Sequence, residues 1–381
     1  GKLKEAEFYS RKAIEINPNH AEAHSNLGGI LRSIGKLKEA EFYALKAIEL
    51  NPNIANAHSN LGNILKDLGK LQEAENSCRK AIKLNPNYAN AYCNLGNVLK
   101  DLGKLNEAEL SYHKAIQIKP DFADALLNLG SILSDLGKLN EAALSTSKAI
   151  KLNSDFPEAL YLLGSIFEDL GKFYEAIELY QRAIFLKDDF TVAKSQLIKC
   201  KGDICDWSNL ESEKKWLENI GLKGPSINPL GILYYQDDPI KQLQRSKNFF
   251  EKKFSRKSIV ISPKKKKKIK IGYFSSDFRA HPVMYLFASI LMLHDKSKFE
   301  IYLYSFVPKE DEYTEIAKTS GCVFKDIKNL TDVEVVQLVR KDNIDIAIDL
   351  MGYTKNHRMN IFSYRVAPLQ LGYLGYPGTT G

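Results

Sequence analysis

Hydrophobic and polar positions in the first half of the chain repeat with a period of 34 residues. The segment Gly-Lys-Leu-Lys-Glu-Ala at 1–6 returns at 35–40, and similar segments begin at Gly69, Gly103, Gly137 and Gly171. A second mark, Asn-Pro-Asn, stands at 17–19, 51–53 and 85–87, and is followed by Lys-Pro-Asp at 119–121 and Asn-Ser-Asp at 153–155. Two turn marks in each period predict two helices in each repeat.

A helix–turn–helix unit of 34 residues, with small residues at fixed places and proline after the second helix, resembles the tetratricopeptide repeat. The small residues are those of the Ala23, Gly28, Ala40 and Ala47 type. We predict a single second helix at about 4–16, five complete helix pairs at about 21–186 and a closing helix at about 191–200. Residues 1–200 are therefore expected to form an all-α superhelix with a continuous core and a concave face for extended ligands.

An asparagine recurs in the first helix of four successive pairs, at Asn26, Asn60, Asn94 and Asn128. We call these four residues the asparagine ladder. Asparagine offers both a donor and an acceptor, so the ladder could bind the backbone of an extended acceptor peptide whatever its side chains. The alternative is that a duplicated asparagine makes only helix–helix hydrogen bonds. Leu162 takes this place in the fifth pair, which should not join the ladder.

Histidine and cysteine give no pattern typical of a metal site. His24 and His58 lack carboxylate or thiolate partners at ligand spacing, so we interpret them as helix-surface residues and expect no metal. The 5 cysteines match neither a zinc site nor a redox pair, which favours reduced thiols and a cytoplasmic location. Cys78 and Cys93 are expected to be packing residues.

Residues 201–268 break the repeat and read as a helical connector that ends in the lysine run 264–268. They contain Cys-Asp-Trp at 205–207, an amphipathic stretch around 211–220 and a helical stretch near 238–254. The net charge is −2 over residues 1–190, from 23 basic and 25 acidic residues, and +10 over the remainder, from 31 basic and 21 acidic residues. An isolated lysine run without interleaved aromatic residues is usually a solvated loop, so we expect neither nucleic acid nor a membrane as partner.

From residue 269 onwards, strand patterns alternate with helix patterns. Strands are predicted at 269–274, 299–304, 322–327 and 344–350, and helices at 282–293, 314–320 and 331–341. This alternation predicts a parallel, Rossmann-like sheet over 269–381, in which ligands bind beyond the carboxyl ends of the strands.

Candidate chemistry stands at those strand ends. The first strand leads to Ser-Ser-Asp-Phe-Arg-Ala-His-Pro at 275–282, and Pro282 at the first helical position places His281 at a helix N-terminus, where a neutral ring is favoured. The strand 344–350 delivers Asp349, followed by Gly352, Tyr353 and Thr354. A last segment ends in glycines and threonines whose free backbone N–H groups suit anion or sugar sites: Gly375, Pro377, Gly378, Thr379 and Thr380.

These motifs, in this order and behind a tetratricopeptide array and a Cys-Asp-Trp linker, resemble the protein O-linked N-acetylglucosamine transferase family, which includes SPINDLY-type O-fucosyltransferases. The resemblance implies an inverting, metal-independent glycosyltransferase of the GT-B type without a cofactor. A nucleotide sugar, with UDP-GlcNAc expected over a fucose donor, would glycosylate Ser or Thr of proteins that the array presents. The resemblance also places His281 at the active site and the Gly-Tyr-Thr and Gly-Thr-Thr-Gly segments in the cleft. His281 and Asp349 are both candidate general bases.

The chain also departs from the family pattern. It stops within the first, N-terminal lobe, and the family's second lobe supplies most nucleotide-sugar contacts, so this fragment is expected to be inactive alone. Two alternatives stay open. One is a tetratricopeptide adaptor that binds proteins and whose α/β segment is not catalytic. The other is a transferase that acts on a lipid or glycan, against which the asparagine ladder argues.

Overall fold

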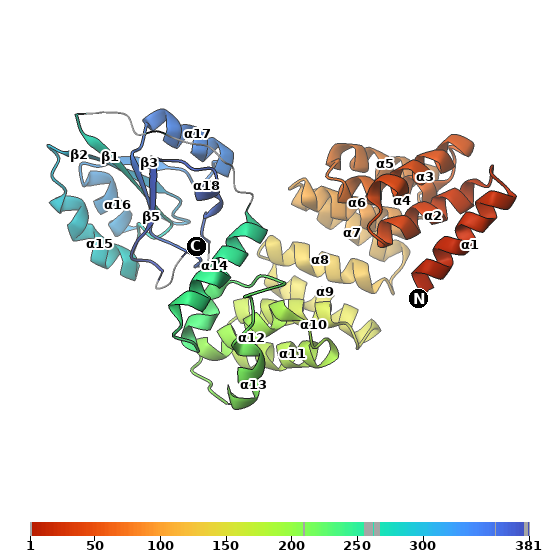
Figure 1. Ribbon diagram of the computed structural model, residues 1–381, viewed down its shortest axis with the longest axis horizontal. Helices are drawn as coiled ribbons and strands as arrows, with labels where there is room; N and C mark the ends of the chain where they lie inside the picture. The colour runs from red at the N-terminus through yellow and green to blue at the C-terminus, as the bar shows by residue number, and fades with distance from the viewer. Residues whose placement is uncertain are drawn as a thin grey trace. The chain divides into compact units, whose positions relative to one another are not determined.

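The computed structural model describes residues 2–208, 210–254, 262, 267–354, 356–376 and 380, and it divides the chain into two compact units, Gly1–Ala193 and Lys194–Gly381. Each unit is described by itself below (Figure 1). In the described residues, no helix is long and apolar enough to cross a membrane.

The first unit consists of antiparallel helix pairs, as the 34-residue period predicts. A single helix, α1 (Lys2–Ile16), precedes five pairs, and α12 (Thr191–Asp203) follows them. The pairs are α2 (Ala21–Ser33) with α3 (Leu37–Leu50), α4 (Ala55–Asp67) with α5 (Leu71–Leu84), α6 (Ala89–Asp101) with α7 (Leu105–Ile118), α8 (Ala123–Asp135) with α9 (Leu139–Leu152), and α10 (Pro157–Asp169) with α11 (Phe173–Leu186). The helices of each pair pack on each other and successive pairs pack together, which builds a main core from Leu27 to Ile166 and two smaller clusters at the later repeats.

Two sets of glycines explain the repeated turns and pairings. Gly69 and its equivalents in the other pairs have φ between +74° and +85°, the left-handed conformation that ends a helix at low cost. Gly130 lies in the middle of α8, where an added Cβ would stand 2.2 Å from Thr146 Oγ1 of α9. Gly96 leaves the same kind of space for Tyr112, at 2.6 Å. The glycine in the first helix therefore lets the second helix pack closely.

The structure corrects one interpretation of the sequence. His24 and His58 are buried, with 5% and 8% of their surface exposed, and are not helix-surface residues. The Nε2 atom of each ring lies 2.9 Å from a carbonyl oxygen, that of Pro18 for His24 and that of Pro52 for His58. These histidines therefore fasten the first helix of a repeat to the turn before it.

The second unit begins with the end of α12 and with three short elements: α13 (Leu210–Leu217), the 3-10 helix η1 (Pro229–Tyr234) and α14 (Pro239–Lys253). Arg245 of α14 is fully buried and donates to the carbonyls of Ile220, Leu217 and Glu218, which ties α14 to the segment after α13. Phe249 and Phe254 join the core of the sheet domain. These elements therefore belong to the same compact unit as the sheet.

The sheet is parallel throughout and has the strand order β3-β2-β1-β4-β5. Its strands are β1 (Ile269–Ser275), β2 (Phe299–Ser305), β3 (Val323–Asp326), β4 (Ile346–Asp349) and β5 (Leu369–Gly372). Helices α15 (Pro282–Leu293) and α16 (Glu312–Thr319) pack on one face, and α14, α17 (Asp332–Asp342) and the short α18 (Asn360–Ser363) pack on the other (Figure 1). The sequence did not predict η1 or α18, because elements this short show no periodicity.

Candidate active site at the carboxyl edge of the sheet

The neighbouring strands β1 and β4 bring two of the predicted motifs together. Phe274 of β1 is in register with Asp349 of β4, so both strands end at the same edge. Beyond them, the hydroxyl groups of Ser275 and Ser276 each donate to Met351 Sδ at 3.5 Å. The loop that leads to His281 therefore contacts the loop that contains Gly352, Tyr353 and Thr354.

His281 is the N-cap of α15 and the more accessible of the two candidate catalytic residues. Its Nδ1 accepts a hydrogen bond from the Val283 N–H at 3.3 Å, and its side chain is 35% exposed. Asp277 Oδ2 lies 3.5 Å from the same nitrogen. Pro282 is exposed at the first position of α15, as the sequence predicts.

The loop before α15 is held by the start of α16. Asp311, the N-cap of α16, accepts from the Ala280 N–H at 2.7 Å, and Thr314 Oγ1 donates to the Phe278 carbonyl at 2.8 Å. The Ala280 N–H is the main cause that lowers the pKa of the Asp311 carboxyl. His281 is thus presented by a fixed loop. Asp277 lies within the motif at 275–282, but the sequence indicated no role for it. The N-cap role of Asp311 was not predicted, although a capping residue three positions before Thr314 is a local signal.

Asp349 is 5% exposed and shapes its own turn. Its Oδ2 accepts from the Gly352 N–H at 2.7 Å, and its Oδ1 accepts from the Met351 N–H at 3.1 Å. Burial raises the pKa of Asp349 to about 7, against these two N–H groups, which lower it. Within the described residues, no hydrogen bond or ion pair joins Asp349 to His281. Asp349 is therefore a buried carboxyl that titrates near neutral pH.

The residues after Asp349 fasten the loop and leave little of it exposed. Gly352 has φ +59°, and an added Cβ would stand 2.2 Å from Tyr376 Cβ, so only glycine fits. Tyr353 is fully buried, and its hydroxyl donates to the Thr380 carbonyl at 2.6 Å. Thr354 Oγ1 donates to the Met351 carbonyl at 2.9 Å.

The glycine-rich segment after β5 packs against the end of β4. A Cβ on Gly375 would stand 1.6 Å from the Leu350 carbonyl oxygen, which explains glycine at this place. Tyr353 joins this segment to the loop after β4 through Thr380. Pro377, Gly378 and Thr379 lie outside the described residues. Three motifs far apart in the sequence therefore meet at one edge of the sheet.

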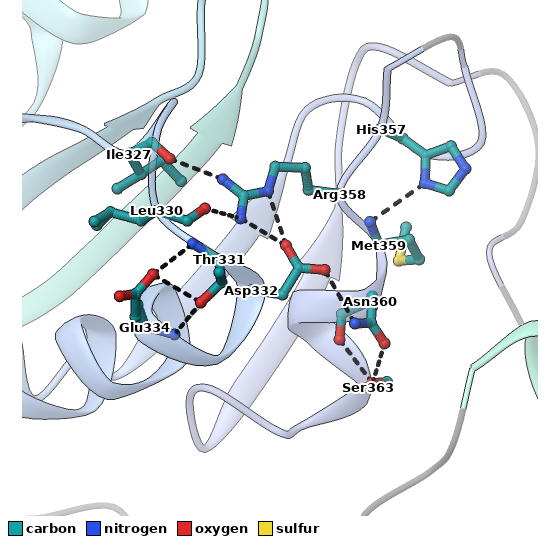
Figure 2. A network of polar contacts seen from close by, with 10 residues as sticks. All are labelled: Ile327, Leu330, Thr331, Asp332, Glu334, His357, Arg358, Met359, Asn360 and Ser363. Carbon is teal, nitrogen blue, oxygen red and sulfur yellow. Dashed lines mark hydrogen bonds and ion pairs between the residues drawn. The ribbon is translucent and has the colours of Figure 1, made fainter. Parts of the chain in front are cut away.

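A polar network around Arg358 holds the loop between β4 and α18 (Figure 2). The Arg358 guanidinium donates to Asp332 Oδ1 at 2.6 and 2.9 Å and to the carbonyls of Ile327 and Leu330 at 2.9 and 2.8 Å. Asp332 Oδ2 also accepts from Asn360 Nδ2 at 3.0 Å. Arg358 therefore joins the loop after β3 to the loop after β4, and no sequence pattern pointed to it.

Two residues of the connector contact Tyr353 in the loop after β4. Asn228, next to η1, donates to the Tyr353 carbonyl at 3.0 Å, and the Phe249 ring of α14 packs edge-on against Tyr353 at 4.9 Å. His357 lies between Tyr353 and Phe254, where burial and the nearby Lys253 lower its pKa to about 4. The ring is therefore neutral and acts as part of the apolar support.

The asparagine ladder lies in the first unit and uses its amide nitrogens within the array. Asn60 Nδ2 donates to the Ser25 carbonyl and hydroxyl, both at 3.2 Å, and Asn94 Nδ2 donates to Ser59 Oγ at 2.9 Å. Asn128 Nδ2 donates to Asn97 Oδ1 at 3.2 Å. Asn26 is exposed. The Oδ1 atoms of the ladder have no partner among the described residues, so each remains an open acceptor.

A groove opens at two residues of this ladder, Asn94 and Asn128. It has a volume of about 320 Å³, and Asn94, Asn97 and Asn128 lie in its lining. Across all the described residues, including this groove, no group of three His, Cys, Asp or Glu side chains is arranged to hold a metal ion. The array therefore offers hydrogen-bond acceptors in a groove.

Comparison with known proteins finds family models that match each of the two units. Residues 243–381 match the glycosyl transferase family 41 model, and tetratricopeptide models match segments between residues 1 and 189. The SEC protein of Arabidopsis thaliana, named as a probable UDP-N-acetylglucosamine–peptide N-acetylglucosaminyltransferase, is 31% identical over 41% of this chain and 18% of its own length. The SPINDLY protein of the same plant, named for the same probable activity, is 39% identical over 30% of this chain and 13% of its own length. The chain resembles the O-GlcNAc transferase and SPINDLY family, with tetratricopeptide repeats followed by a glycosyl transferase family 41 region.

The O-GlcNAc transferase and SPINDLY family also appears among solved structures. A mutant of the O-GlcNAc transferase from Thermobaculum terrenum is 25% identical to this chain, with a TM-score of 0.42 over 75% of this chain and 50% of that one. This chain spans less than a fifth of the length of the two plant relatives.

Proposed function

We propose that this chain is part of a protein O-glycosyltransferase that transfers N-acetylglucosamine from UDP-GlcNAc to Ser or Thr of polypeptides held by the array. In the reaction, the hydroxyl oxygen of the acceptor bonds to the anomeric carbon, the bond from that carbon to the diphosphate breaks, and the hydroxyl proton passes to a base. The nucleoside diphosphate leaves. We propose inversion at the anomeric carbon and no metal requirement, as the family resemblance implies.

The observation that carries this proposal is the meeting of three motifs at the carboxyl edge of a parallel sheet, where such sheets bind ligands. His281 supplies an exposed imidazole there, and Asp349 supplies a carboxyl with a pKa of about 7. Both are proposed catalytic residues. Pro282, Gly352, Tyr353, Thr354 and the segment 375–380 are proposed to form or support the donor side of the cleft.

The asparagine ladder is proposed to bind the acceptor peptide through its carbonyl half. Asn60, Asn94 and Asn128 already donate their amide nitrogens to the array, so a peptide is offered Oδ1 atoms, which accept from peptide N–H groups. Each of these asparagines would then have both roles that the sequence suggested. Its Nδ2 donates within the array, and its Oδ1 accepts from the peptide.

Transfer of a labelled sugar tests the reaction. The chain, and the longest natural protein that contains it, would be incubated with labelled UDP-GlcNAc or GDP-fucose and a protein acceptor, with and without EDTA. We expect label from UDP-GlcNAc on Ser or Thr, unaffected by EDTA and lost in His281→Ala. Activity of the longer protein alone would agree with the expected inactivity of these 381 residues. If no donor labels protein while the array still binds peptides, the adaptor interpretation replaces this one.

Peptide binding tests the ladder. Fluorescence anisotropy would follow an extended Ser/Thr-containing peptide on the chain with Asn94→Ala and Asn128→Ala combined. Loss of two hydrogen bonds predicts affinity weaker by about tenfold. Asn94→Asp with Asn128→Asp keeps the acceptor oxygens and should retain more binding, and Asn76→Ala, an exposed asparagine of α5, is the control. Unchanged affinity in the double alanine variant would mean that the ladder is structural.

A further inference from the structure

The array contains a second groove, which lies apart from the asparagine ladder. It has a volume of about 380 Å³, is formed by α5, α6 and α7 and shares no lining residue with the groove at the ladder. We call it the α5–α7 groove. Tyr92 of α6 lines it and stands two residues before Asn94 of the ladder, so the two side chains leave α6 about 200° apart around the helix axis. The two grooves therefore lie on nearly opposite faces of α6.

The α5–α7 groove has an apolar floor and an exposed apolar wall. Leu95 of α6 is buried at the floor, and Ile82 of α5 and Tyr92 are partly buried beside it. Leu110 of α7 lines the same groove but is 69% exposed. A concave apolar surface with an uncovered leucine at its side can receive an apolar side chain of a ligand.

Lysines from both α5 and α7 line this apolar surface without a carboxylate partner. Among the described residues, Lys83 of α5 makes no hydrogen bond or ion pair, and Lys114 of α7 donates only to the neutral side chain of Gln117. Arg79, the third cation of the groove, is already paired with carboxylates of α5 and α7. The groove therefore offers two unpaired positive charges to a ligand.

The neighbouring repeats show that packing does not require this combination of residues. One repeat earlier, Glu49 stands at the place of Lys83, and Asn76 stands at the place of Leu110. One repeat later, Gln117 stands at the place of Lys83. All these repeats form the same helix pairs, so the two lysines and the exposed leucine are particular to this groove and are not needed for the fold.

We propose that the α5–α7 groove docks an acidic peptide segment that carries one bulky apolar side chain. This side chain lies on Leu95 and against Leu110, and carboxylates on either side of it pair with Lys83 and Lys114. A second copy of this chain, docked by the same face about a two-fold axis, would bring these lysines towards their own kind, which disfavours that occupant. The proposal goes beyond the proposed transfer reaction and does not depend on it.

Binding is tested with a peptide that cannot be a sugar acceptor. Fluorescence anisotropy would follow fluorescein-labelled Gly-Asp-Glu-Asp-Phe-Asp-Glu-Asp-Gly, which lacks Ser and Thr, on the full chain at two salt concentrations. We expect binding that weakens as salt rises, and an affinity at least about tenfold lower when the Phe is replaced by Ala or the acidic residues by their amides. A chain that does not bind this peptide would overturn the proposal.

The place of binding is tested with residues borrowed from the array itself. Lys83→Glu with Leu110→Asn installs the residues found one repeat earlier, so the variant should keep its helical circular dichroism. We expect its affinity for the peptide to fall by about tenfold or more. Lys148→Glu makes the same change of charge at an exposed position of α9, one repeat after Lys114, and should leave the affinity unchanged.

Three results would contradict docking in this groove. Equal weakening in Lys148→Glu would mean that the peptide binds basic surface in general. Loss of peptide binding in Asn94→Ala combined with Asn128→Ala would place the peptide at the ladder. A dimer in sedimentation analysis that Lys83→Glu dissociates, together with no binding of the peptide, would assign the groove to a second copy of the chain.

Discussion

The two units of this chain reach order by different kinds of contact. In the array, each helix packs on a helix less than one repeat away, and the pairing of Gly130 with Thr146 spans only sixteen positions. In the sheet unit, Phe274 lies in register with Asp349, and Asn228 donates to the carbonyl of Tyr353, 125 positions away. Local contacts make the array predictable from its period. Distant contacts place the candidate site, so its geometry had to come from the structure.

The sharpest test of this difference lies at Gly375, where an added Cβ would stand 1.6 Å from the Leu350 carbonyl oxygen. We expect Gly375→Ala to destabilise the second unit by about 3 kcal/mol or more, because backbone cannot move aside as a flexible side chain can. Both tryptophans, Trp207 and Trp216, belong to this unit, so their fluorescence in urea reports its unfolding. Gly372→Ala, whose nearest atom is 3.9 Å away, is the control. Equal midpoints would contradict the close approach.

A pH dependence follows from Asp349, whose pKa is raised by burial to about 7 from an ordinary value of 3.8. The folded unit therefore prefers the protonated carboxyl, and this contribution is present below about pH 4 and is lost as pH rises towards 7. We expect the wild type to lose on the order of 4 kcal/mol across that window relative to Asp349→Asn. Tryptophan fluorescence in urea at several pH values measures it, and parallel curves for the two proteins would refute the shift.

In the array, Gly130→Ala should cost about 1–3 kcal/mol, since the new Cβ would meet Thr146 Oγ1 at 2.2 Å. The damage is local, so Thr146→Ala in the same chain should restore much of the stability, as in the first pair, where Gly28 faces Ala44. Helical circular dichroism during thermal unfolding reports the array. Additive losses in the double variant would show that the two residues do not share a contact.

The smallest effect is expected at His281. Loss of the N-cap hydrogen bond in His281→Ala should destabilise the second unit by about 1 kcal/mol, and His281→Asn, which can still cap, should cost only a few tenths. Tryptophan fluorescence in urea again gives the measurement. An alanine variant as stable as the asparagine variant would mean that the ring does not cap α15.

Much of the site was visible in the sequence as separate motifs. Pro282 predicted His281 at a helix start, and the apolar strand before Asp349 predicted a polar residue at a strand end, because both signals are local. No pattern in the sequence indicated Arg358 or Asn228 as part of the site. Their partners, Asp332 and the Tyr353 carbonyl, lie 26 and 125 positions away, and no spacing rule links such pairs.

The asparagine ladder and the two histidines show the same limit inside the array. The period correctly placed Asn60 and His24 on the first helices, but not the direction of their polar atoms. Asn60 turns its amide nitrogen to Ser25 of the preceding repeat, and His24 reaches back to the Pro18 carbonyl. The packing of neighbouring segments decided both outcomes, because it set which acceptor lies within reach of each side chain.

By itself, the sequence determined the repeat array, the alternation of strands and helices and the family that they resemble, because periodicity, turn glycines and short motifs act over a few residues. Only the tertiary structure decided that Asp349 is buried while His281 stays partly exposed, and that His281 Nδ1 is occupied by its own helix. Desolvation and hydrogen-bond geometry depend on every group packed around an atom, and packing brings those groups from distant parts of the chain.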